Sequence, residues 1–122
     1  MCNTGIIMTR PGEGVYKKVT NSLATADTSK WIFADQSLLS SVFQGRWAPL
    51  PYVYNALKTM RWKGVHDAIW RDDCVKNIHY IMAPKPWEET PSVHADSTHA
   101  WWWEMNGKRK KDDKARGVTD EF

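Results

Sequence analysis

The stretch from Lys76 to Trp87 constrains the fold most, because it reads as a strand that runs into a rigid loop. In a strand, residues 77, 79 and 81 lie on one face and residues 78, 80 and 82 on the other. Pro84 and Pro86 then prevent further ladder pairing, since proline has no backbone N–H to donate. In open α/β sheets, ligands bind at the carboxyl edge, so the sequence predicts a site there.

Three side chains near this edge carry chemistry. His79 offers an imidazole that can bind a metal, Lys85 offers a cation, and Trp87 offers an aromatic wall. For His79 a second interpretation stays open, because a lone histidine in an apolar strand is more often a hydrogen-bonded core residue than a ligand.

Composition excludes several classes of protein. A chain of 122 residues suits one domain with a modest core, and its formal net charge of +3 is too small to indicate nucleic acid. Cys2 and Cys74 lie far apart in sequence, so neither a zinc site nor a disulfide framework is predicted. The sequence shows no charged leader with an apolar core and no apolar run of membrane length. We therefore expect a cytoplasmic protein without a membrane partner.

The first half of the chain predicts a strand and two helices. Residues 2–9 are expected to form a strand, in which Gly5 permits close backbone approach and Asn3 either bonds a ligand or caps a turn. A helix is expected over 11–25, because apolar residues recur there every four positions: Val15, Val19 and Leu23. A second helix is expected to begin with Asp35 as its N-cap and to end with Gly45 at its C-cap.

The middle of the chain alternates between loop and helix. Pro49 and Pro51 exclude a regular helix over 46–54, because each proline forces the preceding residue into an extended conformation. Asn55 is a candidate cap for a helix over 55–62 that Gly64 would close.

The last segment is rich in tryptophan and charge, and we divide the chain into 1–90 and 91–122. Asp96 can cap a terminal helix over 98–106. Trp101, Trp102 and Trp103 cannot share one helix face, since neighbours lie about 100° apart, so at least one must meet solvent, a ligand or a partner. Residues 108–116 form a mixed-charge run typical of a solvated face or frayed end.

Four ordered motifs together resemble the family 8 glycosyltransferases, the group that holds glycogenin and galactinol synthase. They are Asn3-Thr-Gly5, Asp35-Gln36-Ser-Leu-Leu-Ser, Leu50-Pro-Tyr-Val-Tyr-Asn55 and His79-Tyr-Ile-Met-Ala-Pro-Lys85-Pro-Trp87. The His-x-Trp-Trp-Trp tail is similar to fungal members. The resemblance implies an α/β fold, namely the carboxyl-terminal part of a GT-A-type, Rossmann-like nucleotide-sugar transferase domain.

The resemblance also implies a reaction, the retaining transfer of a hexosyl group from a UDP-sugar to a carbohydrate or polyol acceptor. His79 would complete a manganese site, and Lys85 would meet the diphosphate. Asp35 would lie beside the transferred sugar as nucleophile or electrostatic stabiliser. Gln36 would belong to the catalytic pair with Asp35 and bind a sugar hydroxyl. The remaining implied substrate contacts are Asn3, Gly5, Asn55 and Trp87.

The sequence departs from the family in lacking the Asp-x-Asp pair and the nucleotide-binding half that carries it. One imidazole holds manganese weakly, so we expect a truncated form that is not an efficient catalyst alone. The alternative is a noncatalytic carbohydrate-binding or protein-interaction remnant, in which Trp87 and residues 101–103 stack on sugars or on a partner.

Overall fold

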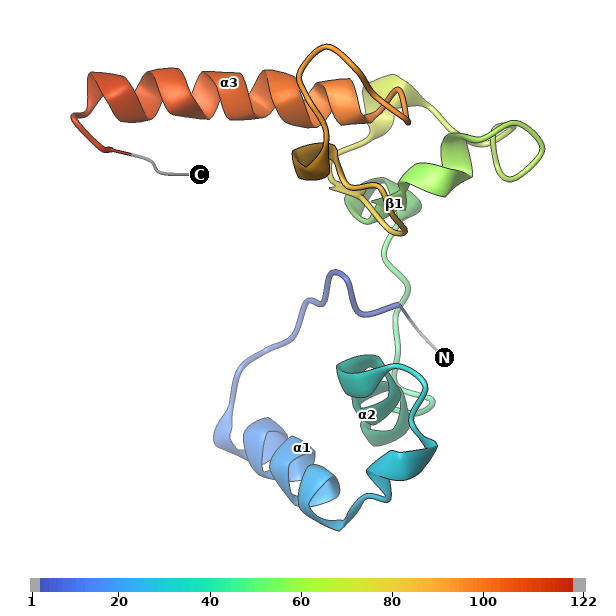
Figure 1. Ribbon diagram of the computed structural model, residues 1–122. Helices are drawn as coiled ribbons and strands as arrows, with labels where there is room; N and C mark the ends of the chain where they lie inside the picture. Colours follow the sequence, from blue (N-terminus) through green and yellow to red (C-terminus); the bar gives the residue numbers. More distant parts are fainter. Residues whose placement is uncertain (1–2, 120–122) are drawn as a thin grey trace. The chain divides into compact units, whose positions relative to one another are not determined.

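The computed structural model describes residues 3–119 and divides the chain into two compact units (Figure 1). The first unit ends at Asn55 and the second begins at Ala56. The first unit contains α1 (Glu13–Thr25) and α2 (Ala34–Val42), and the second contains β1 (Ala56–Leu57), β2 (Ile78–His79) and α3 (His99–Ala115). Short 3₁₀ helices fill some of the connections: Thr28–Lys30, Tyr52–Tyr54, Lys58–Arg61, Asp72–Cys74 and Pro86–Glu88.

In the first unit, α1 packs against α2. The apolar periodicity correctly predicted α1, which begins at Glu13 with Gly12 as its N-cap. Leu38 and Val42 are the buried residues of α2. They recur at helical spacing, so one stripe of α2 supplies the small apolar core of this unit.

Both predicted ends of the second helix were wrong. Phe33 is the N-cap of α2, and Asp35 lies in the first turn, where a carboxylate interacts favourably with the helix dipole. Phe43 is the C-cap, and Gly45 follows it with a φ of 71°. The predicted strand over 2–9 is also absent from the described residues 3–9, which have no neighbouring strand to pair with.

In the second unit, β1 and β2 form a parallel pair with Ala56 opposite Ile78 and Leu57 opposite His79. The strand predicted over 76–82 therefore shrinks to two residues. The reason lies in β1, because the chain enters the 3₁₀ helix Lys58–Arg61 directly after Leu57 and offers no further ladder partner. The helix predicted over 55–62 was also wrong, because residues 56–57 form β1 and residues 58–61 form a 3₁₀ helix.

The terminal helix is longer than predicted and continues through the charged run to Ala115 (Figure 1). Ion pairs one turn apart support it, with 2.6 Å between Glu104 and Lys108 and 3.0 Å between Arg109 and Asp113. At the start of the helix Thr98 is the N-cap, and Asp96 accepts hydrogen bonds from the Thr98 backbone and hydroxyl.

Helices and a small parallel sheet make the fold mixed α/β in kind. Among residues 3–119, no helix combines the length and the apolar composition that crossing a membrane requires. In the described part of the second unit, the buried apolar residues include Ala56, Trp70 and Pro86, whereas the buried polar residues include Lys58, Thr98 and His99. The interior of this unit is therefore unusually polar.

Candidate functional site

In the first unit, Asn3 is a hydrogen-bonding centre. Its Oδ1 accepts from the Gly5 backbone at 2.8 Å and from the Asn55 side-chain amide at 2.9 Å. The bond to Gly5 is the local turn contact typical of asparagine, and the bond to Asn55 spans 52 residues. Asn3 thus joins two of the sequence motifs.

Thr4 joins the third motif to the same place. Its hydroxyl donates to Asp35 Oδ2 at 2.9 Å, and its backbone N–H donates to Gln36 Oε1 at 3.1 Å. Within the first unit, the residues predicted from three separate motifs therefore meet around residues 3–5. Asp35 is an exposed residue, and its Oδ2 accepts the hydrogen bond from Thr4.

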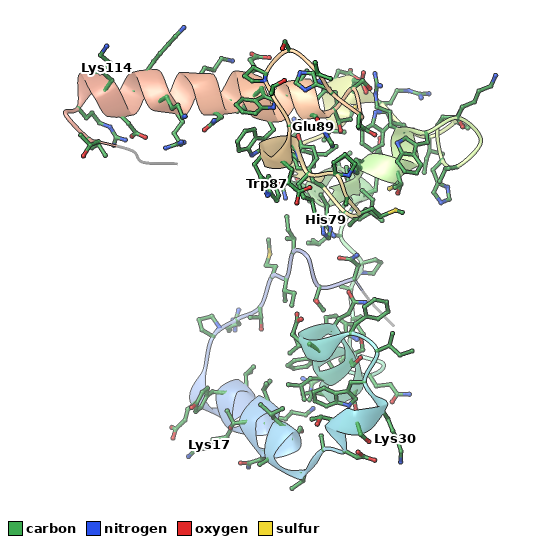
Figure 2. All side chains as sticks on the ribbon, viewed as in Figure 1. Lys17, Lys30, His79, Trp87, Glu89 and Lys114 are labelled. Carbon is green, nitrogen blue, oxygen red and sulfur yellow. The ribbon has the colours of Figure 1, made fainter. Side chains whose placement is uncertain are left out.

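In the second unit, His79 lies on β2 and is half-buried (Figure 2). Burial lowers the pKa of its imidazole, and the nearby Lys85 ammonium lowers it further. Its Nδ1 is buried and has no hydrogen-bond partner among residues 3–119. A neutral imidazole with a free nitrogen is the form that a metal ion binds.

The described residues do not supply a complete metal site. No group of three or more His, Cys, Asp or Glu side chains in residues 3–119 is arranged to hold a metal ion. His79 fits the role of a single ligand, and manganese requires several.

Lys85 lies in the proline-containing loop after β2, and hydrogen bonds hold both its backbone and its side chain. Its Nζ donates to the Tyr80 carbonyl at 2.5 Å, and its backbone N–H donates to Glu88 Oε2 at 2.7 Å. The ammonium is half-buried and has no carboxylate partner in the described part of the chain. It can therefore exchange the carbonyl for an anionic ligand.

Trp87 is 54% exposed and lies beside the start of α3 (Figure 2). Its ring centroid is 6.0 Å from that of Trp102, which in turn meets Trp103 edge to face at 4.9 Å. Trp87, Trp102 and Trp103 thus form a continuous aromatic cluster in which Trp87 is exposed.

A buried polar network in the same unit carries no signal in the local sequence. Lys58 Nζ lies 3.3 Å from His99 Nε2, and His99 Nδ1 lies 2.8 Å from Glu89 Oε2. The sequence pattern places Lys58 in a helix over 55–62 and does not single out Glu89. A buried lysine is rare and its partner is 41 residues away, so no local pattern indicates the pair.

Comparison with known proteins identifies relatives for most of the chain. The model of glycosyl transferase family 8 matches residues 1–91. Galactinol synthase 1 of Solanum lycopersicum is 30% identical over 98% of this chain and 38% of its own length. Glycogenin of Komagataella phaffii is 23% identical over 84% of this chain and 30% of its own length.

The chain therefore spans 38% of the length of the galactinol synthase and 30% of the length of the glycogenin. No solved structure matches it. The family match covers all four motifs and confirms the predicted resemblance. The chain belongs to glycosyl transferase family 8.

Proposed function

We propose that this chain is part of a GT-A-type glycosyltransferase that moves a hexosyl group from a UDP-sugar to a carbohydrate or polyol acceptor with retention. The observation that carries the proposal is the hydrogen-bonded meeting of Asn3, Asp35, Gln36 and Asn55. Residues far apart in sequence thus meet around residues 3–4, close to the exposed carboxylate of Asp35, and such a cluster of polar groups could bind a sugar.

The first unit would act on the transferred sugar. Asp35 has one oxygen fixed by Thr4, which leaves the other for the anomeric carbon as nucleophile or as electrostatic stabiliser of positive charge. Gln36 and Asn55 would bind hydroxyl groups of the sugar or its acceptor. In the reaction the bond from the anomeric carbon to the diphosphate oxygen breaks, and a bond to the acceptor oxygen forms as that hydroxyl loses its proton.

The second unit would act on the diphosphate. Lys85 would stabilise the negative charge on the leaving group, and Trp87 would shield it from water. His79 would be one ligand to manganese, which when bound supplies charge neutralisation at the diphosphate. Such a site needs further ligands, and residues 3–119 hold no group of three or more His, Cys, Asp or Glu side chains arranged to bind a metal ion.

A fluorescence titration tests the proposal, since eight tryptophans report on the chain. UDP is added with and without manganese to wild type, to His79→Ala and to His66→Ala, a control at an exposed histidine of the same unit. We expect manganese-dependent quenching in wild type and His66→Ala that is lost in His79→Ala. No response at millimolar UDP in a folded wild-type chain would contradict the assignment of the site in this chain.

A noncatalytic carbohydrate-binding function is the second candidate, and the exposed face of Trp87 favours it. This function predicts quenching by a soluble oligosaccharide without UDP or manganese. The response should disappear in Trp87→Ala and persist in Trp47→Ala, which changes a tryptophan of the first unit. An oligosaccharide response that survives Trp87→Ala would contradict it.

A further inference from the structure

Lys58 is a buried lysine with a complete set of hydrogen-bond partners. Lys58 is 2% exposed, and its ammonium group has three N–H donors. Nζ donates to the Pro84 carbonyl at 2.8 Å and the Met82 carbonyl at 3.4 Å, and it lies 3.3 Å from His99 Nε2. Burying a charge is costly unless it is fully bonded, so this arrangement is specific.

The two hydrogen-bond partners of His99 indicate which of its ring nitrogens carries the proton. An ammonium cannot accept a hydrogen bond and a carboxylate cannot donate one. Nε2 of His99 therefore accepts from Lys58, and Nδ1 carries the proton that it donates to Glu89 at 2.8 Å. A chain of charge-assisted bonds thus runs from Lys58 through His99 to Glu89, which Figure 2 labels below the start of α3.

The two carbonyls that Lys58 binds belong to the loop that carries Lys85. Met82 has a φ of 60°, a left-handed conformation that is uncommon for a residue with a side chain. Such a conformation persists where surrounding contacts impose it, and it is often found at functional sites. Lys85 follows Pro84 directly, so the bonds to Lys58 set the backbone from which Lys85 extends.

An apolar residue in place of Lys58 would avoid the cost of burying a charge. Buried charges are often no more stabilising than well-packed apolar groups of similar volume. The stability of the unit does not explain why an ammonium is present. Its partners explain it better, since two of the three are the carbonyls of a single loop.

We propose that Lys58 is a positioning residue that holds the loop of Met82 and Pro84 in the conformation that presents the Lys85 ammonium to the diphosphate of the donor. This inference rests on the proposed function in that the diphosphate is the ligand of Lys85. Lys58 itself touches no substrate and acts through Lys85.

A double-mutant cycle on UDP binding tests the inference, with wild type, Lys58→Met, Lys85→Met and the double variant of the full chain. Lys58→Met should raise the UDP dissociation constant roughly tenfold, the effect of one charged hydrogen bond. Lys85→Met should do the same, and the double variant should bind no more weakly than Lys85→Met alone. Additive losses would show that Lys58 does not act through Lys85 and would overturn the inference. Lys110→Met, at an exposed lysine of α3, is the matched control and should bind as wild type does.

Hydrogen exchange separates this inference from the proposed function. If wild type does not bind UDP, the proposed site fails for this chain, but the loop can still be examined. In Lys58→Met, the amides of residues 80–88 should exchange faster than in wild type and Lys110→Met, whereas those of α1 should not change. Unaltered exchange over 80–88 would overturn the role of Lys58.

A second variant covers the case in which Lys58→Met does not fold. Lys58→Gln keeps an amide with two N–H donors, so it can bind one carbonyl while losing the charge. We expect it to fold and to show faster exchange over 80–88, and exchange equal to that of wild type would again contradict the inference.

Discussion

Asp72 shows how a single carboxylate can hold a loop. Arg61 binds it with two parallel hydrogen bonds, from Nε to Oδ1 and from Nη2 to Oδ2, both 2.8 Å long. The indole N–H of the buried Trp70 donates to the same carboxylate. The bonds from Arg61 and then from Trp70 lower the pKa of Asp72 to about 2. The carboxylate thus joins the chain on either side of the 62–71 loop.

This lowered pKa predicts how stability depends on pH. The contribution of Asp72 is complete above its unfolded-state pKa of about 3.9, and it disappears as the pH falls to about 2. Its size should not exceed about 1 kcal/mol, because the Asp72 side chain is 48% exposed and the ion pair is screened by solvent. Urea unfolding between pH 2 and pH 7 measures it.

In Asp72→Asn the free energy of unfolding should be lower at pH 7 and should change less between pH 4 and pH 2. Asp73→Asn makes the same chemical change at the neighbouring exposed residue and serves as the control. An acid transition that is identical in wild type and Asp72→Asn would contradict the prediction.

At the scale of the elements, α3 contains two glycines with opposite roles. Gly107 lies inside the helix, and a Cβ built on it meets no atom within 4 Å. Gly117 follows the helix with a φ of 70°, and the bonds Gly117 N–H to Lys114 and Val118 N–H to Asp113 close a Schellman motif around it.

The two glycines therefore predict opposite effects of the same substitution. Gly107→Ala should stabilise α3 by about 0.5–1 kcal/mol, because glycine is a poor helix former. Gly117→Ala should destabilise it by about 1 kcal/mol, because alanine is strained in the left-handed conformation. Thermal unfolding followed by circular dichroism at the helix band measures both, and a loss of stability in Gly107→Ala would refute the assignment of that residue to a regular helix.

The contact between α1 and α2 makes a separate prediction for the first unit. Leu38 of α2 is 8% exposed, whereas Leu23 of α1 is 48% exposed. Leu38→Ala should cost about 2–3 kcal/mol of unfolding free energy, and Leu23→Ala should cost less than about 1 kcal/mol. Denaturant unfolding followed by tryptophan fluorescence compares them, and equal losses would mean that α2 does not supply the core of this unit.

The sequence predicted those parts of the structure that depend on local pattern. Helix α1 followed from the spacing of Val15, Val19 and Leu23, and the loop after His79 followed from two prolines. The motif residues were found by resemblance, and those of the first unit do converge around Asn3.

Contacts over long sequence separations were not predictable in this way. The length of β2 depends on its partner β1, which ends where a 3₁₀ helix begins, so the alternation over 76–82 overestimated the strand. Lys58 and His99 carry no signal in their own neighbourhoods, because only the folded chain brings them within 3.3 Å. The roles of the predicted site residues and the division at residue 90 stay predictions.

At the scale of the whole molecule, the described residues bury few apolar side chains and expose many. Leu38, Val42, Ala56 and Trp70 are buried, whereas Ile32 is 83% and Ile69 is 55% exposed. The two-residue strands of the sheet also have unpaired edges within residues 3–119. Exposed apolar surface of this kind binds apolar dyes and promotes association.

We therefore expect the purified chain to bind the dye ANS and to sediment faster as its concentration rises. The double variant Ile32→Ser and Ile69→Ser, with one change in each unit, should bind less dye at unchanged helix content. A wild-type chain that binds no dye and sediments as a monomer at every concentration would contradict this expectation.

The separation between Lys58 and His99 also has a consequence during protein synthesis. The ammonium leaves the ribosome long before the imidazole, which lies 41 residues later in the chain. Until α3 begins to emerge, the Lys85 loop lacks the completed network that holds it, and Lys58 remains hydrated. The second unit should therefore acquire its structure only after the start of α3 has emerged from the ribosome, and a nascent chain arrested before His99 should be sensitive to protease in the 58–88 segment.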